Sequence, residues 1–240
     1  MNPPGVLSGR HILVTGAGGA LGRGLTAACA AAGATVGAFI RQRPPGPEVR
    51  ASAAPDLQDV DSVARALGEI ESVSGPVHAL IHAAATHGDR LVARQSTASW
   101  SEMAEQPLRS AFTCSRAVLP GFFRSGGGDI LYIGSLASMR PQPGQCAYAA
   151  AKGALESLAR AQARELAPKN IRVNCLAPGF IDSPRLSAFS PEQLDALRAL
   201  VPLARWASVA EVSAWAVFLL SHRASYLTGQ TIRIDGGASI

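Results

Sequence analysis

The stretch that decides the fold of this chain is Thr15–Gly22, which reads TGAGGALG. It follows the apolar run His11–Val14 and opens the alanine-rich stretch Leu21–Ala32, which Gly33 ends. Glycines between a strand and a helix let the backbone turn tightly, and the free N–H groups at the helix start attract a phosphate. The pattern predicts a pyrophosphate-binding turn after the first strand; the alternative interpretation is a tight turn without a ligand.

Strand-like and helix-like stretches alternate along the rest of the chain. Apolar runs predict further strands at Thr35–Ile40, Val77–Ala85, Asp129–Ile133, Arg172–Ala177 and Thr231–Ile234. Helical spacing predicts helices at Asp59–Ser72, Tyr148–Leu166, Pro191–Val201 and Ala210–Ser221. Such alternation is typical of βαβ units, so we expect an α/β fold: a doubly wound parallel sheet covered by helices on both faces, in a single domain over residues 1–240.

Composition excludes several classes of protein. The 240 residues are 48% hydrophobic and 16% charged, which excludes disorder. Four separated cysteines without a CxxC pair argue against disulfides and zinc, so we expect no metal site. The net charge of +5 is not gathered into an aromatic-interleaved patch, so we expect no nucleic-acid partner. No signal peptide or membrane-spanning run is visible, and a cytoplasmic location is expected.

The residues after the second strand bear on the cofactor. That strand ends at Ile40 without an acidic residue, and Arg41 and Arg43 follow. A carboxylate there would repel a 2′-phosphate, whereas a guanidinium can pair with it. The pattern favours NADP(H) over NAD(H). The alternative is that both arginines belong to a solvated loop before Pro44 and Pro45.

A tyrosine and a lysine are spaced to act together. Tyr148 and Lys152 lie one turn apart on one face of the predicted helix. An ammonium nearby favours the phenolate of a tyrosine, which can exchange a proton with a carbonyl or alcohol oxygen. Ser135 follows the strand Asp129–Ile133, where its hydroxyl can polarise the same oxygen.

These motifs together closely resemble the short-chain dehydrogenase/reductase family. TGAGGALG, Ser135, Tyr148–Lys152 and Pro178-Gly179 occur in the order usual there, and SYLTGQTIRIDGG (225–237) is similar to its last-strand segment. The resemblance runs from Leu7 to Gly237 and implies a Rossmann fold and a CH–OH/C=O oxidoreductase.

The resemblance also implies roles for particular residues. Tyr148 would be the acid/base, Lys152 would hold the nicotinamide ribose and favour the phenolate, and Ser135 would orient the substrate carbonyl. Asp56 and Leu57 match the positions that contact adenine, and Ile181 and Ser183 those that hold the carboxamide. The full set of implied cofactor-binding residues is Gly16, Gly18, Gly19, Ala20, Leu21, Gly22, Arg41, Asp56, Leu57, Ala83, Tyr148, Lys152, Pro178, Gly179, Ile181 and Ser183.

Two departures from the family pattern stand out. His82-Ala83-Ala84-Ala85 replaces the usual Asn-Asn-Ala-Gly, and we interpret His82 as structural. Pro107 stands where the family has a catalytic Asn, whose backbone carbonyl holds a water linked to the lysine. Proline keeps the carbonyl but lacks an N–H and tends to kink a helix.

Within the family, four stretches look most like 3-oxoacyl-[acyl-carrier-protein] reductases. They are THGDRLVAR (86–94), GQCAYAAAKGAL (144–155), ELAPKNIRVNCLAPGFID (165–182) and VPLARW (201–206). The likeness implies an acyl-thioester substrate, a loop near 181–197 that covers it, and a homotetramer. Lys169, with Arg124 nearby, matches the basic region that meets the acidic acyl carrier protein.

Three hypotheses of function follow. The first is NADPH-dependent reduction of a 3-oxoacyl thioester, in a specialised fatty-acid or polyketide-like pathway. The second is a dehydrogenase/reductase of a free secondary alcohol or ketone. The third, motivated by Pro107 and the HAAA stretch, is a weakly active cofactor-binding subunit that needs a partner chain.

Overall fold

A seven-stranded parallel sheet forms the centre of the computed structural model, which describes residues 5–86 and 88–240. Its strand order is β3-β2-β1-β4-β5-β6-β7, so the order reverses between β1 and β4. Each neighbouring pair runs parallel. The strands are β1 (His11–Thr15), β2 (Thr35–Phe39), β3 (Ala51–Ala53), β4 (Ala79–His82), β5 (Gly128–Ile133), β6 (Ile171–Pro178) and β7 (Thr231–Ile234).

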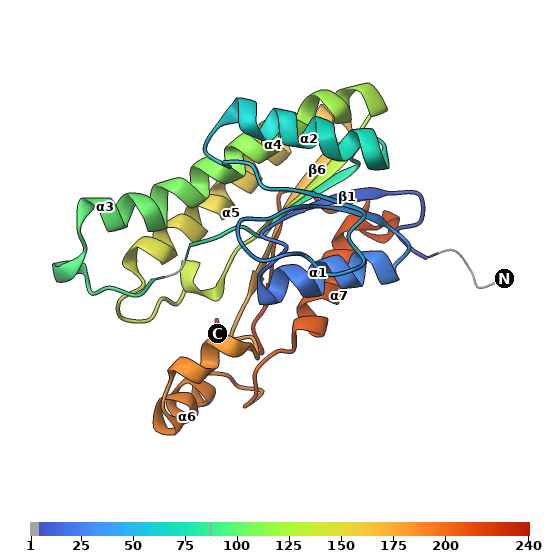
Figure 1. Ribbon diagram of the computed structural model, residues 1–240. Helices are drawn as coiled ribbons and strands as arrows, with labels where there is room; N and C mark the ends of the chain where they lie inside the picture. The colour runs from blue at the N-terminus through green and yellow to red at the C-terminus, as the bar shows by residue number, and fades with distance from the viewer. Residues whose placement is uncertain (1–4, 87) are drawn as a thin grey trace.

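Helices cover both faces of the sheet (Figure 1). The face above the sheet in that view carries α2 (Val60–Ser74), α4 (Gln106–Ser125) and α5 (Cys146–Leu166), and the other face carries α1 (Ala20–Ala31) and α7 (Val209–Leu220). Shorter helical elements are η1 (Val92–Arg94), α3 (Thr97–Trp100), η2 (Ser101–Glu105), η3 (Leu136–Ser138), η4 (Ala167–Lys169), η5 (Pro184–Ala188), α6 (Pro191–Ala199) and η6 (His222–Ala224). The fold is the doubly wound α/β architecture that the alternating sequence predicts.

The central strands are apolar because both of their faces are buried. In β1, Leu13 packs into the hydrophobic cluster beneath α2, α4 and α5, whereas Ile12 and Val14 pack into the cluster beneath α1 and α7. Successive side chains of a strand point to opposite faces, so a strand covered on both sides reads as a continuous apolar run.

Most predicted elements are present with ends shifted by one or two residues, but one predicted strand is shorter, and helix α4 and strand β3 were not among the elements predicted from spacing. The predicted strand Val77–Ala85 pairs only over Ala79–His82, because the N–H groups of Ala83 and Ala84 turn to the hydroxyl of Thr15. The edge strand Ala51–Ala53 was not predicted, since three small residues carry no alternating apolar pattern.

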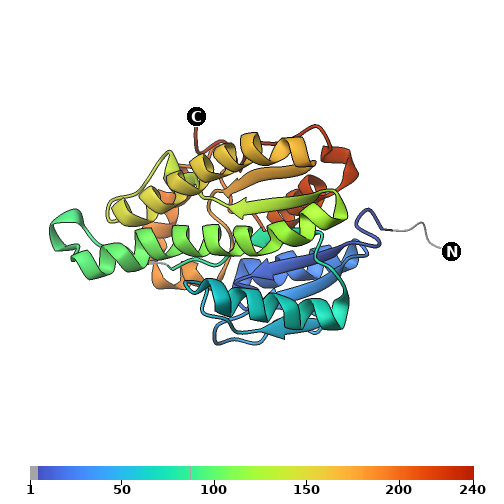
Figure 2. The same cartoon turned by 90° about the horizontal axis from the view of Figure 1, so that it is seen from above.

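Pro107 lies inside a continuous helical rod formed by α3, η2 and α4 (Figure 2). The element η2, directly before it, is a π-helical turn over Ser101–Glu105. A proline ring clashes with the carbonyl four residues earlier in a regular helix and cannot donate there. The wider π turn takes up this misfit, so the predicted disturbance takes the form of a local change in helix type.

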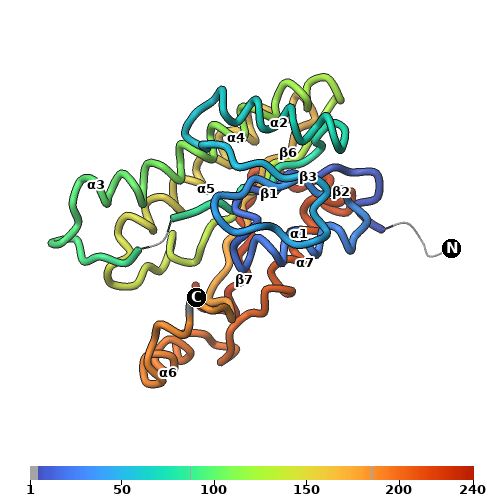
Figure 3. The backbone as a smooth tube through the Cα atoms, viewed as in Figure 1, coloured from blue at the N-terminus to red at the C-terminus, as the bar shows by residue number. Residues whose placement is uncertain are grey.

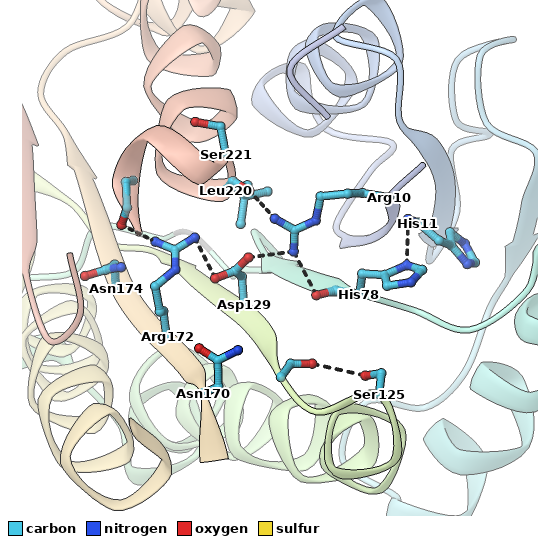
Figure 4. Close-up of polar contacts among 12 residues, drawn as sticks. Arg10, His11, His78, Ser125, Asp129, Asn170, Arg172, Asn174, Leu220 and Ser221 are labelled. Carbon is cyan, nitrogen blue, oxygen red and sulfur yellow. Dashed lines mark hydrogen bonds and ion pairs between the residues drawn. The ribbon is translucent and has the colours of Figure 1, made fainter. Parts of the chain in front are cut away.

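The amino-terminal edge of the sheet is joined by a buried ion cluster (Figure 4). Asp129 of β5 pairs with Arg10, just before β1, at 2.5 Å and with Arg172 of β6 at 2.7 Å. The two guanidinium groups also donate to the backbone carbonyls of Leu220 and Ala224. Burial raises the pKa of Asp129, and both arginines act in the opposite direction. The cluster links three strands to the end of α7.

The segment between β6 and α7 extends away from the sheet and carries α6, as the tube in Figure 3 shows. An isolated parallel β-bridge between Ile181 and Ala207 joins the beginning of this segment to its end. The N–H of Asp182 donates to Ala207, and the N–H of Ala207 donates to Phe180. The predicted substrate loop near 181–197 is therefore anchored at its first residues.

Two sequence-based interpretations touch residues that the structure does not describe. His87 of the stretch 86–94 lies outside the described residues. So do residues 1–4 of the amino-terminal segment in which no signal peptide is visible. Among the described residues, no helix combines the length and the apolar character needed to cross a membrane.

Candidate active site

A cavity of about 920 Å³ opens at the carboxyl-terminal edge of the sheet, where the strand order reverses. Crevices at this position are the usual ligand sites of doubly wound sheets. Every predicted site residue lines it: Gly16, Gly18, Gly19, Ala20, Leu21, Gly22, Arg41, Asp56, Leu57, Ala83, Ser135, Tyr148, Lys152, Pro178, Gly179, Ile181 and Ser183. The fold thus brings segments from the whole length of the chain to one cavity.

The glycine-rich turn has the properties of an anion cradle. Gly16 has a φ of +68°, a conformation that favours glycine. A Cβ at Gly18 would lie 2.5 Å from the carbonyl oxygen of Arg43, so only glycine fits between the two loops. Gly19 caps α1 without a side-chain acceptor, and the first turn of α1 has no acidic residue. Its N–H groups are left for a phosphate, and the cradle fits a dinucleotide.

The far end of the cavity combines basic and amide side chains. Arg41 and Arg43 both line it, with Gln42 between them, and both arginines are exposed. Asp56 and Leu57 line the same region after β3. The positions thus suit an adenosine moiety with a negatively charged substituent, and Arg43, which we weighed together with Arg41 in the sequence, also lines the cavity.

Ser135, Tyr148 and Lys152 meet on the cavity wall between β5 and α5. Lys152 is buried, and its Nζ donates to the carbonyl oxygen of Ile133 at 2.8 Å. The same Nζ lies 5.5 Å from the centre of the Tyr148 ring. The hydroxyl of Ser135 accepts the N–H of Ala137 at 3.1 Å, so its own proton can be donated into the cavity.

A buried carboxylate supports the turn that carries Ser135. Glu156 lies one turn after Lys152 on α5 and forms a short hydrogen bond with the hydroxyl of Ser138. The same hydroxyl lies 2.8 Å from the carbonyl oxygen of Ser135, and Arg233 of β7 pairs with Glu156 at 3.4 Å. The turn Ser135–Ser138, called the serine turn from here on, is therefore held from both α5 and β7.

His82 occupies the strand position opposite Thr15, where the strand order reverses. The Thr15 hydroxyl accepts the N–H groups of Ala83 at 3.2 Å and Ala84 at 3.1 Å. Both of its lone pairs are used, so its proton is directed to Nδ1 of His82, which lies 3.1 Å away. The donor count therefore places the imidazole proton on Nε2.

The opposite nitrogen of His82 extends the hydrogen-bonded chain to α4. Nε2 lies 3.3 Å from the hydroxyl of Ser110, which donates to the carbonyl oxygen of Pro107 at 2.9 Å. Burial, with the Lys152 ammonium nearby, lowers the pKa of His82 to about 3, so the ring is neutral. His82 has the structural role we expected of it, and Ser110 is a partner that the sequence did not indicate.

The cavity also has lining residues that sequence reasoning missed. Arg140 follows the serine turn and Gln142 and Gln145 precede α5, while Phe180 and Leu186 belong to the segment after β6. Gln145, Phe180 and Leu186 lie in stretches that we quoted from the sequence, but no residue pattern marks them individually, because they reach the cavity from loops whose course depends on the whole fold. Their only signal in the sequence is their nearness to Ser135, Tyr148 and Pro178.

Two basic residues that we singled out in the sequence do not line the cavity. Arg124 and Lys169 are exposed and lie at the turns that lead into β5 and β6, near the opposite edge of the sheet.

Among residues 5–86 and 88–240, no three His, Cys, Asp or Glu side chains come together as a metal site. The four cysteines are free thiols.

Comparison with known proteins agrees with this geometry. Residues 16–239 match the protein family described as Enoyl-(Acyl carrier protein) reductase. The chain is 34% identical to Nodulation protein G of Rhizobium sp. (strain N33), with 98% of each chain covered. It is 33% identical to the 3-oxoacyl-[acyl-carrier-protein] reductase of Vibrio cholerae, which covers 96% of this chain and 98% of the relative.

A solved structure shares the whole architecture. The gluconate 5-dehydrogenase of Burkholderia cenocepacia J2315, in complex with NADP and tartrate, superposes with a TM-score of 0.90 at 27% identity, covering 97% of this chain and 96% of that one. The fold, the cavity and these matches lead to one assignment. The chain belongs to the short-chain dehydrogenase/reductase family and is an oxidoreductase acting on a CH–OH or C=O group.

Proposed function

We propose that this enzyme reduces a 3-oxoacyl thioester to the 3-hydroxyacyl form with NADPH. The observation that carries the proposal is the meeting of Ser135, Tyr148 and Lys152 on the wall of the cavity that the glycine-rich turn opens. The similarity to 3-oxoacyl-[acyl-carrier-protein] reductases over almost the whole chain supports this substrate class.

The three side chains have complementary tasks. NADPH, when bound along the glycine-rich turn and beside Lys152, supplies the hydride. The hydroxyl of Ser135 donates a hydrogen bond to the substrate carbonyl oxygen and holds it in place. Tyr148 gives that oxygen a proton as charge develops on it, and the nearby ammonium of Lys152 stabilises the phenolate that remains.

The test is NADPH oxidation with an acetoacetyl thioester by the wild type and the Tyr148→Phe variant. We expect the variant to bind NADPH normally and to lose activity by at least about 100-fold, the scale of general acid catalysis. Tyr226→Phe is the matched control, because Tyr226 is fully exposed. Wild-type protein that binds NADPH but turns over only after a second chain is added would instead identify a partner-dependent subunit.

The choice of NADPH over NADH rests on Arg41 and Arg43, which would pair with the 2′-phosphate. Arg41→Ala should raise the KM for NADPH by about 10- to 100-fold and leave the KM for NADH unchanged, since only the charge-assisted contact is lost. Arg50→Ala is the control, because Arg50 is exposed but does not line the cavity. Equal effects on both cofactors would contradict this assignment.

An acidic acyl carrier protein is the proposed carrier of the substrate, with Arg124 and Lys169 as its contacts. The loops that bear them are joined, since the side-chain amide of Asn170 donates to the carbonyl of Gly126 at 3.3 Å. Lys169→Glu should raise the KM for a carrier-bound substrate and leave that for a small thioester unchanged. Arg65→Glu makes the same charge change on the exposed side of α2 and should affect neither.

A free alcohol or ketone is the second candidate substrate. The likeness to a gluconate 5-dehydrogenase and the polar side chains of Arg140, Gln142 and Gln145 in the cavity favour it. Turnover of free keto acids or ketones, with none of thioesters, would select this alternative.

We also propose a homotetramer in the cytoplasm. Phe112 and Phe123 of α4 are each 49% exposed, and Trp215 of α7 is 42% exposed, which supplies apolar surface for contacts between copies. Four free thiols suit a reducing compartment. Light scattering that gives the mass of one chain would contradict the tetramer.

A further inference from the structure

A second cavity, of about 340 Å³ and called the side cavity from here on, adjoins the main cavity described above. Its walls are mostly apolar. They consist of Leu136, Met139, Pro141, Phe180, Leu200 and Ala238, with Arg140 and Gln142 between them. They come from the serine turn, the segment after β6, the end of α6 and the carboxyl-terminal stretch.

The two cavities share part of their walls. Leu136, Arg140, Gln142 and Phe180 line both. Leu136 directly follows Ser135, so the shared wall begins next to the hydroxyl that faces the reacting oxygen. The two cavities are therefore continuous enough for a substituent of a carbonyl held by Ser135 and Tyr148 to extend along this wall.

The single cationic group of its lining is held by backbone carbonyl groups. Arg140 donates through Nη1 to the carbonyl oxygens of Ala238 at 3.0 Å and Ile240 at 2.8 Å. This fixes the guanidinium on the carboxyl-terminal stretch. Apart from Gln142, the remaining lining residues are apolar, and Leu136 and Ala238 belong to a packed cluster with Val201, against which Phe180 rests.

We propose that this side cavity binds the alkyl part of the substrate's acyl chain, so that the enzyme selects for chains longer than four carbons. The inference rests on the proposed function, since it places a further part of the same thioester. The six apolar residues of these walls offer no hydrogen bond to a polar ligand such as a sugar acid, whereas each methylene removed from water against them contributes favourably.

The experiment is a chain-length series. We would measure kcat/KM for the 3-oxoacyl thioesters of N-acetylcysteamine, from four to twelve carbons, with saturating NADPH. Full burial of a methylene corresponds to about a fourfold gain in affinity. We expect kcat/KM to rise by up to about fourfold per methylene and then to level off once the cavity is filled.

Leu200→Trp tests the location of the chain. Leu200 lines the side cavity but not the main one and is 46% exposed, so the larger ring can fill the space without disturbing the core. The variant should keep the wild-type activity toward the four-carbon substrate and lose the gain with chain length. Leu203→Trp is the control, because Leu203 is 64% exposed and lines neither cavity.

The outcomes separate the two proposals. A rising series in the wild type that flattens in Leu200→Trp but not in Leu203→Trp supports the side cavity. A flat series in the wild type, or a rise that Leu200→Trp leaves intact, overturns it while leaving the reductase activity established. Absence of turnover with every thioester, including the shortest, overturns the proposed function and the acyl-chain site with it.

Discussion

His82 shows how one buried side chain can connect two elements of the fold. It sits at 1% exposure between Thr15 and Ser110, and its neutral ring passes hydrogen bonds from the strand edge to α4. A charged ring there would face the buried Lys152 ammonium, so the site favours the neutral form.

This environment predicts a pH effect on stability. The pKa of His82 is lowered to about 3, so the unfolded chain takes up a proton below pH 6.5 that the folded chain does not. The free energy of unfolding therefore keeps its full value above pH 6.5. It falls by up to about 1.4 kcal/mol per pH unit as the pH drops toward 4. His82→Asn should remove this part of the slope, measured by denaturant unfolding from pH 7 to pH 4.

The controls for this measurement are other histidines. His11 and His78, whose pKa values burial also lowers, add the same slope to the wild type and the variant. His222 is exposed, so His222→Asn should follow the wild-type curve. If the stability of His82→Asn also follows the wild-type pH curve, the imidazole of His82 is not the group that causes the slope.

The helical rod of α3, η2 and α4 shows how an element adapts to an unfavourable residue. Pro107 follows the π turn Ser101–Glu105, whose Met103 and Ala104 are buried against α5 residue Ala147. The packing of these apolar side chains fits the wider turn, so the rod continues without ending at the proline.

Replacing Pro107 with alanine should stabilise the protein. The variant restores a backbone donor and removes the ring, and a proline inside a helix costs about 3 kcal/mol. We expect the free energy of unfolding to rise by about 1–3 kcal/mol in urea. A lower stability of Pro107→Ala would show that the buried Met103 contact requires the π turn irrespective of the proline.

The two edges of the sheet have different tasks in the whole molecule. The carboxyl-terminal edge carries the cavity, whereas the amino-terminal edge carries the cluster of Asp129 with Arg10 and Arg172. Because the strands separate these two edges, stability and ligand binding can be altered independently.

Asp129→Asn tests this separation. Removing the carboxylate leaves two half-buried guanidinium groups without their shared counter-charge, so we expect a loss of about 3 kcal/mol in unfolding free energy. The Kd for NADPH should stay unchanged. Asp195→Asn is the control, because its pair with Arg198 lies on the exposed surface of α6 and contributes at most about 0.5 kcal/mol. A large change in NADPH affinity at unchanged stability would contradict the prediction.

The sequence by itself predicted the layered fold, and the residues that it singled out for catalysis and cofactor binding all line one cavity. These features are local: Tyr148 and Lys152 share a helix face, and the turn Thr15–Gly22 needs its glycines whatever surrounds it. Strands buried on both faces also read as apolar runs, which made their positions visible without coordinates.

Only the tertiary structure decided how distant segments meet. The side cavity joins Leu136 to Ala238 and Leu200, and the chain through His82 joins Thr15 to Ser110. The strand Ala51–Ala53 exists because β2 offers it a free edge. Such contacts depend on the packing of whole elements, and no spacing along the chain encodes the distance between residues brought together by folding.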